Sequence, residues 1–322
     1  MDNRQSLSFS EQERAEARQL NRKLARFPRF KIRNRVMPVL IQSLLRVSQI
    51  GGGKLTRHGL QAEKKIVITH GVPVSVRIIR PKGQPKGVVL DFHGGGWVIG
   101  NAQMNDDLNV AMVNECDVAV VSVDYRLAVS TPVEGVMDDC FSAACWLLGD
   151  NCPEFAGLPV IVVGESAGGH LAATTLLKLK EKPELLQRVK GALLYYGVYD
   201  LTGTPSVRAA GPETLVLDGP GMVEALRLLT PGLTDEQRRQ PTLSPLYGDL
   251  SGMPPALMFV GDIDPLLDDT LQMAERWKTV AEVEVHRLPD LPHGFVHFPT
   301  AMSGRVLARS REWLSGMIKA EA

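Results

Sequence analysis

The most constraining feature of this chain is a short apolar run that leads directly into a serine flanked by glycines. Residues 158–163 read LPVIVV and are followed by GESAGG, which places Ser166 between Gly164 and Gly168. This pattern predicts a buried strand that turns sharply into a helix, because glycines let two backbones approach where a Cβ atom would collide. The turn lifts the Ser166 hydroxyl toward the positive N-terminal end of the helix, an arrangement suited to a nucleophile.

A second apolar run ends in three consecutive glycines. Residues 87–92 are followed by His93 and then by glycine at 94–96, well upstream of the serine. Glycines directly after a strand leave backbone N–H groups unscreened, and acyl transfer requires such donors where a carbonyl oxygen becomes an oxyanion. A lone triple glycine favours a flexible turn, but His-Gly-Gly-Gly after a strand and before Gly-x-Ser-x-Gly predicts an oxyanion loop.

A serine nucleophile needs a base, and three histidines follow Ser166 at a useful distance. His286 falls in an alternating, strand-like stretch, which predicts a residue on a face of that strand. His297 lies near the start of the last predicted helix, which favours packing or a place at a rim. His293 lies on a loop at the end of a strand, where catalytic side chains are commonly carried. We therefore predict His293 as the base.

The acid that orients this histidine is expected between the serine and the histidine along the chain. Residues 255–260 form a strand-like run that opens into Asp262 and Asp264. Asp264 precedes Pro265, which biases the aspartate away from the helical region and makes the proline a suitable first helical residue. An aspartate at that position also suits a helix cap, and Asp262 is the rival candidate. Asp264 is favoured as the acid.

Five motifs in this order resemble those of the hormone-sensitive-lipase-like esterases, a family of α/β-hydrolases, and most of all the bacterial acetyl esterases among them. They are HGGGW from His93, DYRL from Asp124, GESAGG from Gly164, DPL from Asp264 and HGF from His293. The resemblance runs from about Lys65 to the C-terminus.

The resemblance implies roles for individual residues. It assigns a catalytic triad to Ser166, Asp264 and His293, and an oxyanion hole to the N–H groups of Gly95, Gly96 and Ala167. We also predict that Trp97, which adjoins the oxyanion glycines, and Glu165 line the substrate pocket. The family usually has Asp where this chain has Glu165, and Ala-Pro-Glu where it has Ala128-Val129-Ser130. Loop contacts at these two places are therefore not carried over. No metal or organic cofactor is implied.

Apolar runs and helical patterns alternate along most of the chain. Strands are predicted near 65–70, 73–79, 87–92, 117–123, 159–163, 190–196, 255–261 and 282–288, and helices near 104–115, 134–149, 166–181, 266–280 and 299–318. A first hairpin followed by alternating strands and helices indicates a mostly parallel eight-stranded sheet with helices on both faces. Right-handed crossovers bring the predicted site residues to one edge of that sheet. This is the α/β-hydrolase fold, with a small helical cap, that the resemblance implies.

Two segments fall outside this alternation. Residues 1–60 are expected to form an N-terminal helical cap, and Ser10 with Glu13 makes a capping box at the start of a helix. Residues 61–322 are the expected catalytic domain. Within it, the Gly- and Pro-rich stretch 201–245, with a helix-like part at 221–229, is predicted to be a cap insertion.

The N-terminal segment is strongly basic. Between positions 17 and 62 the chain has eleven Lys and Arg residues and no Asp or Glu. An anionic membrane surface is one interpretation of this pattern. The favoured interpretation is a cap helix whose apolar face covers the acyl pocket, because Pro28 and Pro38 prevent one continuous amphipathic helix. Membrane contact is therefore not expected.

Composition indicates a globular protein without nucleic-acid partners. Hydrophobic residues make up 44% of the 322 residues, and the formal net charge is zero. Cys116, Cys140, Cys145 and Cys152 lack metal-type spacing, so buried free thiols and a cytoplasmic location are expected. No apolar run is long enough to span a membrane, and the charged start is unlike a signal peptide.

The sequence thus predicts a serine carboxylesterase that hydrolyses small-molecule, short-chain acyl esters through an acyl-enzyme intermediate. An amide hydrolase or an interfacial lipase on the same triad, and a non-catalytic small-molecule receptor, are the alternatives. The physiological ester, its alcohol group and the oligomeric state, including a homodimer, stay open.

Overall fold

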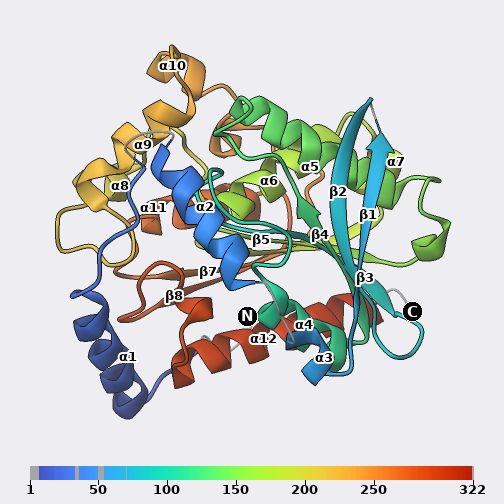
Figure 1. Ribbon diagram of the computed structural model, residues 1–322, viewed down its shortest axis with the longest axis horizontal. Coiled ribbons are helices and arrows are strands. Elements are labelled where there is room, and N and C mark those ends of the chain that lie inside the picture. The colour runs from blue at the N-terminus through green and yellow to red at the C-terminus, as the bar shows by residue number, and fades with distance from the viewer. Residues whose placement is uncertain (1–6, 33–35, 50–53, 70, 321–322) are drawn as a thin grey trace.

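A single twisted sheet forms the centre of the molecule (Figure 1). The computed structural model describes residues 7–32, 36–49, 54–69 and 71–320. The sheet has eight strands in the order β1-β2-β4-β3-β5-β6-β7-β8. The strands are β1 (Ala62–Thr69), β2 (Val72–Ile79), β3 (Gly87–Phe92), β4 (Val118–Asp124), β5 (Val160–Glu165), β6 (Val189–Tyr195), β7 (Ala256–Gly261) and β8 (Val283–Leu288).

Strand directions follow the predicted pattern. β1 and β2 form an antiparallel hairpin, β2 is also antiparallel to β4, and every other pair of neighbours is parallel. The predicted mostly parallel eight-stranded sheet is therefore confirmed. β1 starts at Ala62 rather than near 65, and the exposed residues 63–65 at its start are hydrophilic because this strand lies at the edge of the sheet.

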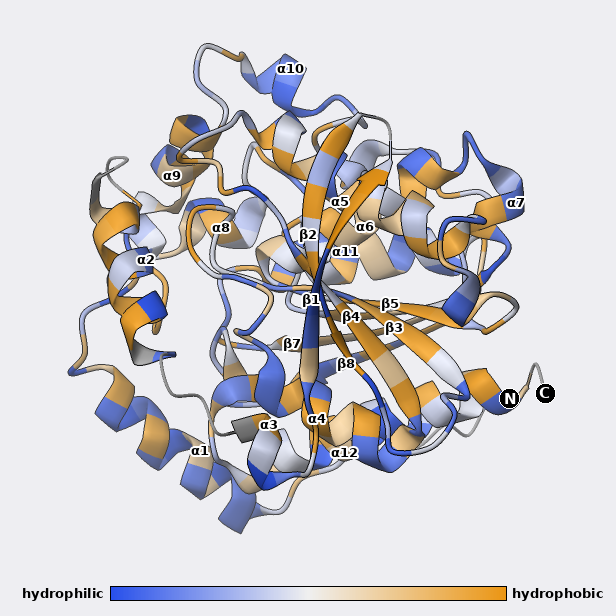
Figure 2. Cartoon of the chain, turned by 45° about the vertical axis from the view of Figure 1, so that its right-hand side comes forward, coloured by the Kyte–Doolittle hydropathy of each residue, from blue (hydrophilic) through white to orange (hydrophobic). Residues whose placement is uncertain are grey.

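Long helices cover both faces of the sheet. Figure 1 shows α5 (Val133–Leu148), α6 (Ala167–Leu179) and α11 (Leu267–Lys278) on one face, and α4 (Asp106–Cys116) and α12 (Ala301–Lys319) on the other. β3, β5 and β7 are buried along their whole length, and Figure 2 shows the central strands as mostly hydrophobic. Because helices cover both faces, these strands have continuous apolar sequences instead of alternating ones.

Short helical elements complete the chain. The insertion at 201–245 contains α8 (Pro205–Ala209), α9 (Met222–Leu229) and α10 (Asp235–Arg238), together with the single turn η2 (Gly219–Gly221). The helix expected at 221–229 is therefore confirmed as α9. The others are α3 (Lys54–Arg57), α7 (Pro183–Leu186), η1 (Pro153–Phe155), η3 (Pro245–Tyr247) and η4 (Phe295–His297).

The N-terminal segment does not form one continuous helix, as its prolines predict, and it contains two longer helices. α1 (Glu11–Leu24) begins with the expected capping box, in which the N–H of Glu13 donates to Ser10 Oγ and the N–H of Ser10 donates to the Glu13 carboxylate. α2 (Val36–Ser48) carries Pro38 in its first turn, where no intrahelical partner is lost.

Polar contacts hold both helices against loops of the main domain. Arg14 and Arg18 of α1 form ion pairs of 2.8 and 3.1 Å with Asp290. Gln42 of α2 bonds through its side-chain amide to both the N–H and the carbonyl of Gly100. α1 therefore packs on the loop before His293, and α2 packs on the loop that follows the triple glycine.

All four cysteines are free and buried, as predicted. Burial raises the pKa of each thiol, so all four are protonated near neutral pH. Across the described part of the chain, no helix combines the length and apolar character needed to cross a membrane.

Candidate active site

Ser166 occupies a strained turn between β5 and α6. Its backbone has φ 53° and ψ −120°, which is uncommon for a residue with a side chain. A Cβ atom on Gly164 would lie 2.3 Å from the carbonyl oxygen of Gly168. A Cβ atom on Gly168 would lie 1.9 Å from the carbonyl oxygen of Phe92. Both glycines are therefore needed for the close packing of this turn against β3, as the sequence predicts.

Gly168→Ala is expected to lower the free energy of unfolding by about 3 kcal/mol or more, because β3 and α6 must move apart. Gly304→Ala in α12 is the matched control, since a Cβ there meets nothing within 4 Å. We expect this control to stabilise the protein by about 0.5–1 kcal/mol. Urea unfolding of both variants tests the prediction. A Gly168→Ala protein as stable as the unchanged chain would contradict it.

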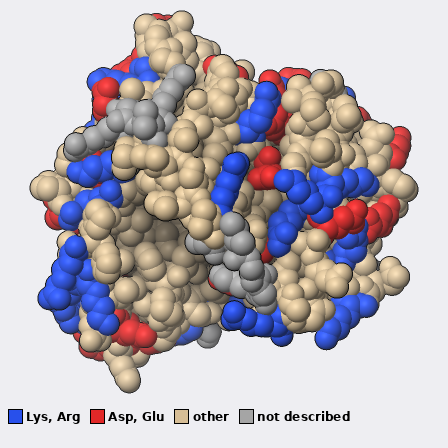
Figure 3. All heavy atoms as spheres, viewed as in Figure 1, with Lys and Arg blue, Asp and Glu red and all other residues tan. Residues whose placement is uncertain are grey.

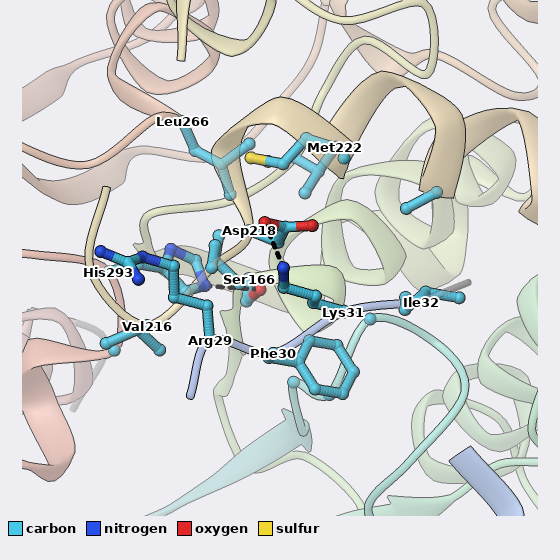
Figure 4. Close-up of a pocket in the computed structure, with 18 of the residues that line it drawn as sticks. Arg29, Phe30, Lys31, Ile32, Ser166, Val216, Asp218, Met222, Leu266 and His293 are labelled. Atoms are coloured by element: carbon cyan, nitrogen blue, oxygen red, sulfur yellow. Dashed lines mark hydrogen bonds and ion pairs between the residues drawn. The ribbon is translucent and has the colours of Figure 1, made fainter. Parts of the chain in front are cut away.

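Ser166, His293 and Asp264 form a continuous hydrogen-bonded chain. Ser166 Oγ lies 2.9 Å from His293 Nε2, and His293 Nδ1 lies 2.9 Å from Asp264 Oδ2 (Figure 4). The Asp264 carboxylate is fully buried, and the His293 side chain is 6% exposed. The structure thus brings together three residues that lie far apart in the sequence.

The two candidate aspartates have different partners. Asp264 Oδ1 accepts from the N–H of Leu266 at 2.8 Å, so this residue caps the turn before α11 while its other oxygen bonds His293. Asp262 Oδ1 instead accepts from the N–H of Asp290 at 2.9 Å. Asp262 therefore holds the backbone of the loop that carries His293 and has no contact with the imidazole.

The loop after β3 presents backbone N–H groups near Ser166. Gly95 and Gly96 have φ values of 101° and 60°, and a Cβ on Gly95 would lie 2.2 Å from the carbonyl oxygen of Ile99. Ala167 is the first residue of α6. Among the described residues, no acceptor is hydrogen-bonded to the N–H groups of Gly95, Gly96 or Ala167. These donors are therefore available to an oxygen atom near Ser166.

A buried tyrosine from the DYRL motif supports this loop. Tyr125 stacks on His93 at 4.1 Å between ring centroids, and its hydroxyl donates to the His93 carbonyl at 2.7 Å. Burial raises the pKa of Tyr125 well above its usual value, so the hydroxyl keeps the proton that it donates. This role of the motif was missed at the level of sequence, because the contact joins segments from different strands.

Glu165 and His297 form an ion pair beside the serine. Glu165 Oε2 lies 2.7 Å from His297 Nε2 and accepts from the Tyr196 hydroxyl at 2.8 Å. Burial alone would raise the pKa of Glu165, but the charge of His297 and these hydrogen bonds lower it to about 2. Burial lowers the pKa of His297, but the charge of Glu165 and the hydrogen bond to it together raise the pKa above its usual value. The His297 contact was missed, although the position lies close to His293 in the sequence.

One cavity of about 780 Å³ contains these groups. Ser166, His293 and the glycines at 94–96 line it, and so do Trp97 and Glu165. Trp97 is nearly buried, and its indole N–H donates to His170 Nδ1 at 3.2 Å. The volume lies within the usual range for a small-molecule site.

Two segments outside the sheet roof the cavity. The N–H of Phe30 donates to the Val216 carbonyl at 2.6 Å, and the N–H of Asp218 donates to the Phe30 carbonyl at 3.1 Å. Residues 29–32 and several residues of 212–228 line the cavity wall. A Cβ on Gly96 would lie 3.0 Å from Ile32, so this roof also touches the glycine loop.

The expectation that an apolar helix face covers the pocket is wrong for α2. None of the described α2 residues lines the cavity. Five of its large apolar side chains are instead 47–71% exposed, namely Met37, Val39, Leu40, Leu44 and Val47. Figure 3 shows a mostly uncharged surface over α2 and Lys and Arg side chains over α1. Gln42, whose amide bonds Gly100, turns the more polar side of α2 inward.

Comparison with known proteins places the chain in a family. The model of the alpha/beta hydrolase fold family matches residues 89–297, so the chain belongs to that family, within its hormone-sensitive-lipase-like branch. Its relatives are named carboxylesterases or esterases, so the chain is a carboxylic ester hydrolase by family. The assignment confirms the fold class and the family resemblance drawn from the five motifs.

Individual relatives and solved structures agree. Carboxylesterase NlhH of Mycobacterium tuberculosis is 32% identical over 237 residues, which cover 70% of this chain and 71% of that protein. Esterase LipW from Mycobacterium marinum superposes with a TM-score of 0.81 at 27% identity, covering 92% of this chain and 95% of that one. An esterase of the bacterial hormone-sensitive lipase family gives 0.77 at 26% identity, covering 97% and 100%.

Proposed function

We propose that this protein is a serine carboxylesterase that hydrolyses small-molecule, short-chain acyl esters. The observation that carries the proposal is the chain of hydrogen bonds from Ser166 through His293 to Asp264 in the floor of the cavity. A serine hydroxyl becomes an effective nucleophile when an adjacent imidazole accepts its proton and a carboxylate orients the imidazole.

The reaction follows from these positions. The Ser166 oxygen attacks the ester carbonyl while His293 Nε2 takes the hydroxyl proton, and the Asp264 carboxylate stabilises the imidazolium that forms. The alcohol leaves with the proton from His293, and the acyl group stays on Ser166. Water then repeats the same two steps and releases the acid.

The N–H groups of Gly95, Gly96 and Ala167 supply the oxyanion hole in this proposal. They are available donors at the serine, and each donor of this kind lowers the barrier by about 3 kcal/mol. The Glu165 carboxylate, paired with His297, lies next to this loop, and the N–H of Gly94 lies 3.4 Å from Glu165 Oε1. Glu165 therefore acts as a positioning residue for the loop.

We also propose that the N-terminal segment and the 201–245 insertion together form the cap of a catalytic domain that begins near residue 61. The bridge between Phe30 and Leu217 supports this division, because it joins the two segments directly over the cavity. Four buried free thiols favour a cytoplasmic, reducing location.

Hydrolysis of a matched ester and amide tests the proposed reaction. The purified chain is expected to hydrolyse p-nitrophenyl butyrate rapidly and p-nitrobutyranilide far more slowly. The reverse preference would identify an amide hydrolase on the same triad. Binding of both compounds without hydrolysis of either would identify a receptor and overturn the proposal.

The preferred acyl chain is expected to be short, from acetyl to hexanoyl. Each methylene adds about 0.8 kcal/mol of binding only while the cavity has room for it, and a longer chain causes overpacking. The cavity must hold the alcohol part as well, and the bulky Trp97 lines it beside the oxyanion glycines. A series of p-nitrophenyl esters measures kcat/KM against chain length. A maximum at decanoyl or longer, or a jump in rate above the solubility limit, would identify a lipase.

A further inference from the structure

One cation in the substrate cavity has no carboxylate partner in the part of the chain that the structure describes. Besides His293, the Lys, Arg, Asp, Glu and His side chains that line the cavity are Arg29, Lys31, Glu165, Asp218, Glu224 and His297. Lys31 Nζ lies 3.2 Å from Asp218 Oδ1, and Glu165 pairs with His297. Among the described residues, Arg29 has no ion pair, so its positive charge is the one left uncompensated inside the wall.

Arg29 is held firmly in this position. Its Nε–H donates to the carbonyl of Thr214, and the next residue, Phe30, is fixed by two backbone hydrogen bonds to the insertion. The side chain is half-buried, and Figure 4 shows it among the lining residues around Ser166 and His293. The Arg29 side chain is therefore anchored at its guanidinium group, and the backbone next to it is fixed as well.

The guanidinium retains donors that no protein acceptor uses. Arginine has five N–H donors and stays charged. One of them binds Thr214, and no acceptor among the described residues binds the Nη groups of Arg29. Glu224 does not compensate this charge, because it is exposed on α9 and forms no ion pair with Arg29. Most of the other lining residues are apolar, so the cation gains more from a bound anion there than at an open surface.

We propose that Arg29 is a binding site for an anionic group of the substrate, so that the preferred esters carry a carboxylate in addition to the scissile ester. This inference rests on the proposed esterase function and deepens it. A planar carboxylate can accept two parallel hydrogen bonds from the free Nη donors, which fixes the position of the substrate as well as adding affinity. A monoester of a short dicarboxylic acid, or an ester of a hydroxy acid, has this chemistry.

Two matched substrate pairs test the proposal and locate the anion. The first pair compares mono-p-nitrophenyl glutarate with p-nitrophenyl glutaramate, which differ by a charge in the acyl part. The second pair compares para-acetoxybenzoate with para-acetoxybenzamide, which differ by a charge in the alcohol part. For each pair we measure the ratio of kcat/KM for the acid to kcat/KM for the amide. In one pair, we expect Arg29→Gln to lower this ratio about tenfold, or about 1.4 kcal/mol, mainly by raising KM for the acid. High salt is expected to reduce the ratio in the unchanged protein.

Two further variants separate charge from structure. Arg29→Lys keeps the charge but loses the planar fork, so we expect its ratio for the acid over the amide to lie between those of Arg29→Gln and the unchanged protein. Arg227→Gln removes an exposed cation of α9 outside the cavity, and it is expected to leave both the activity and the ratio unchanged. If Arg29→Lys behaves like Arg29→Gln, the side chain serves only as a structural contact to Thr214, and the proposal is wrong.

Binding gives a readout that does not depend on turnover. Calorimetry on the Ser166→Ala protein is expected to show mono-p-nitrophenyl glutarate or para-acetoxybenzoate binding about tenfold more weakly when Arg29 is also changed to Gln. Equal binding by both proteins would overturn the anion site even if the neutral esters are hydrolysed. Failure of the unchanged protein to hydrolyse any of the four compounds would instead overturn the esterase function, while the binding measurement still decides the anion site.

Discussion

Ser166→Ala is expected to lower ester turnover by about six orders of magnitude while the protein stays folded. The side chain supplies only one hydroxyl to the structure, and the strained backbone at φ 53° is held by the packing of Gly164 and Gly168 around it. Loss of the nucleophile removes the acyl-enzyme route altogether. Hydrolysis of p-nitrophenyl acetate, followed alongside circular dichroism and thermal unfolding, measures both effects.

The control for this prediction is a serine near the cavity but outside the proposed reaction. The Ser206 hydroxyl donates to the carbonyl of Pro265 in the turn before α11, and Ser206→Ala is expected to leave turnover within a few fold of the unchanged protein. A Ser166→Ala protein that is well folded and still hydrolyses the ester near the original rate would show that another residue is the nucleophile.

Asp264→Asn is expected to lower turnover by about 10⁴, as happens when a triad carboxylate loses its charge and the histidine adopts the wrong tautomer. Asp264 Oδ2 is the only carboxylate oxygen on His293 among the described residues. The Leu266 N–H can still donate to the side-chain amide oxygen that this substitution introduces, so the turn before α11 is preserved.

Asp262→Asn is the matched control for the acid. Its amide oxygen can still accept from the N–H of Asp290, so the loop that carries His293 should keep its position. We therefore expect a much smaller loss of turnover than for Asp264→Asn. Steady-state kinetics on both proteins give the ranking. If Asp262→Asn causes the larger loss, the role of the acid passes to Asp262.

The sheet could be predicted from the sequence because its central strands are buried on both faces. Burial of this kind requires continuous apolar runs such as 158–163, and these are visible without any knowledge of the partner strands. The start of the edge strand β1 is harder to predict from the sequence. Its first residues are hydrophilic and exposed, so they carry no apolar signal, and only the pairing with β2 places them in a strand.

The candidate triad could also be predicted in large part, because each member follows directly on a recognisable strand. The choice between Asp262 and Asp264 depended on a single proline, whereas the structure separates them by their partners, His293 for one and the Asp290 backbone for the other. The Glu165–His297 pair could not be predicted in this way. It joins residues 132 positions apart, and neither sequence environment indicates a charge partner.

The roof of the cavity was the least predictable part. The apolar stretch near 36–50 predicts a helix that covers a pocket, yet α2 leaves much of its apolar side exposed. The residues that close the cavity are 29–32, which have no regular secondary structure. Their position depends on a backbone bridge to 216–218, and backbone hydrogen bonds between distant segments leave no pattern in the side chains.

Covalent labelling of the nucleophile is the most direct test of the proposed reaction. The organophosphate diethyl p-nitrophenyl phosphate reacts with an activated serine and leaves a stable phosphoryl group in place of the acyl group. After incubation, intact mass spectrometry and peptide mapping are expected to show one diethylphosphoryl group per chain, on Ser166, and a parallel loss of esterase activity. Loss of activity with the label on a different residue, or full activity with Ser166 labelled, would contradict an acyl-enzyme formed on Ser166.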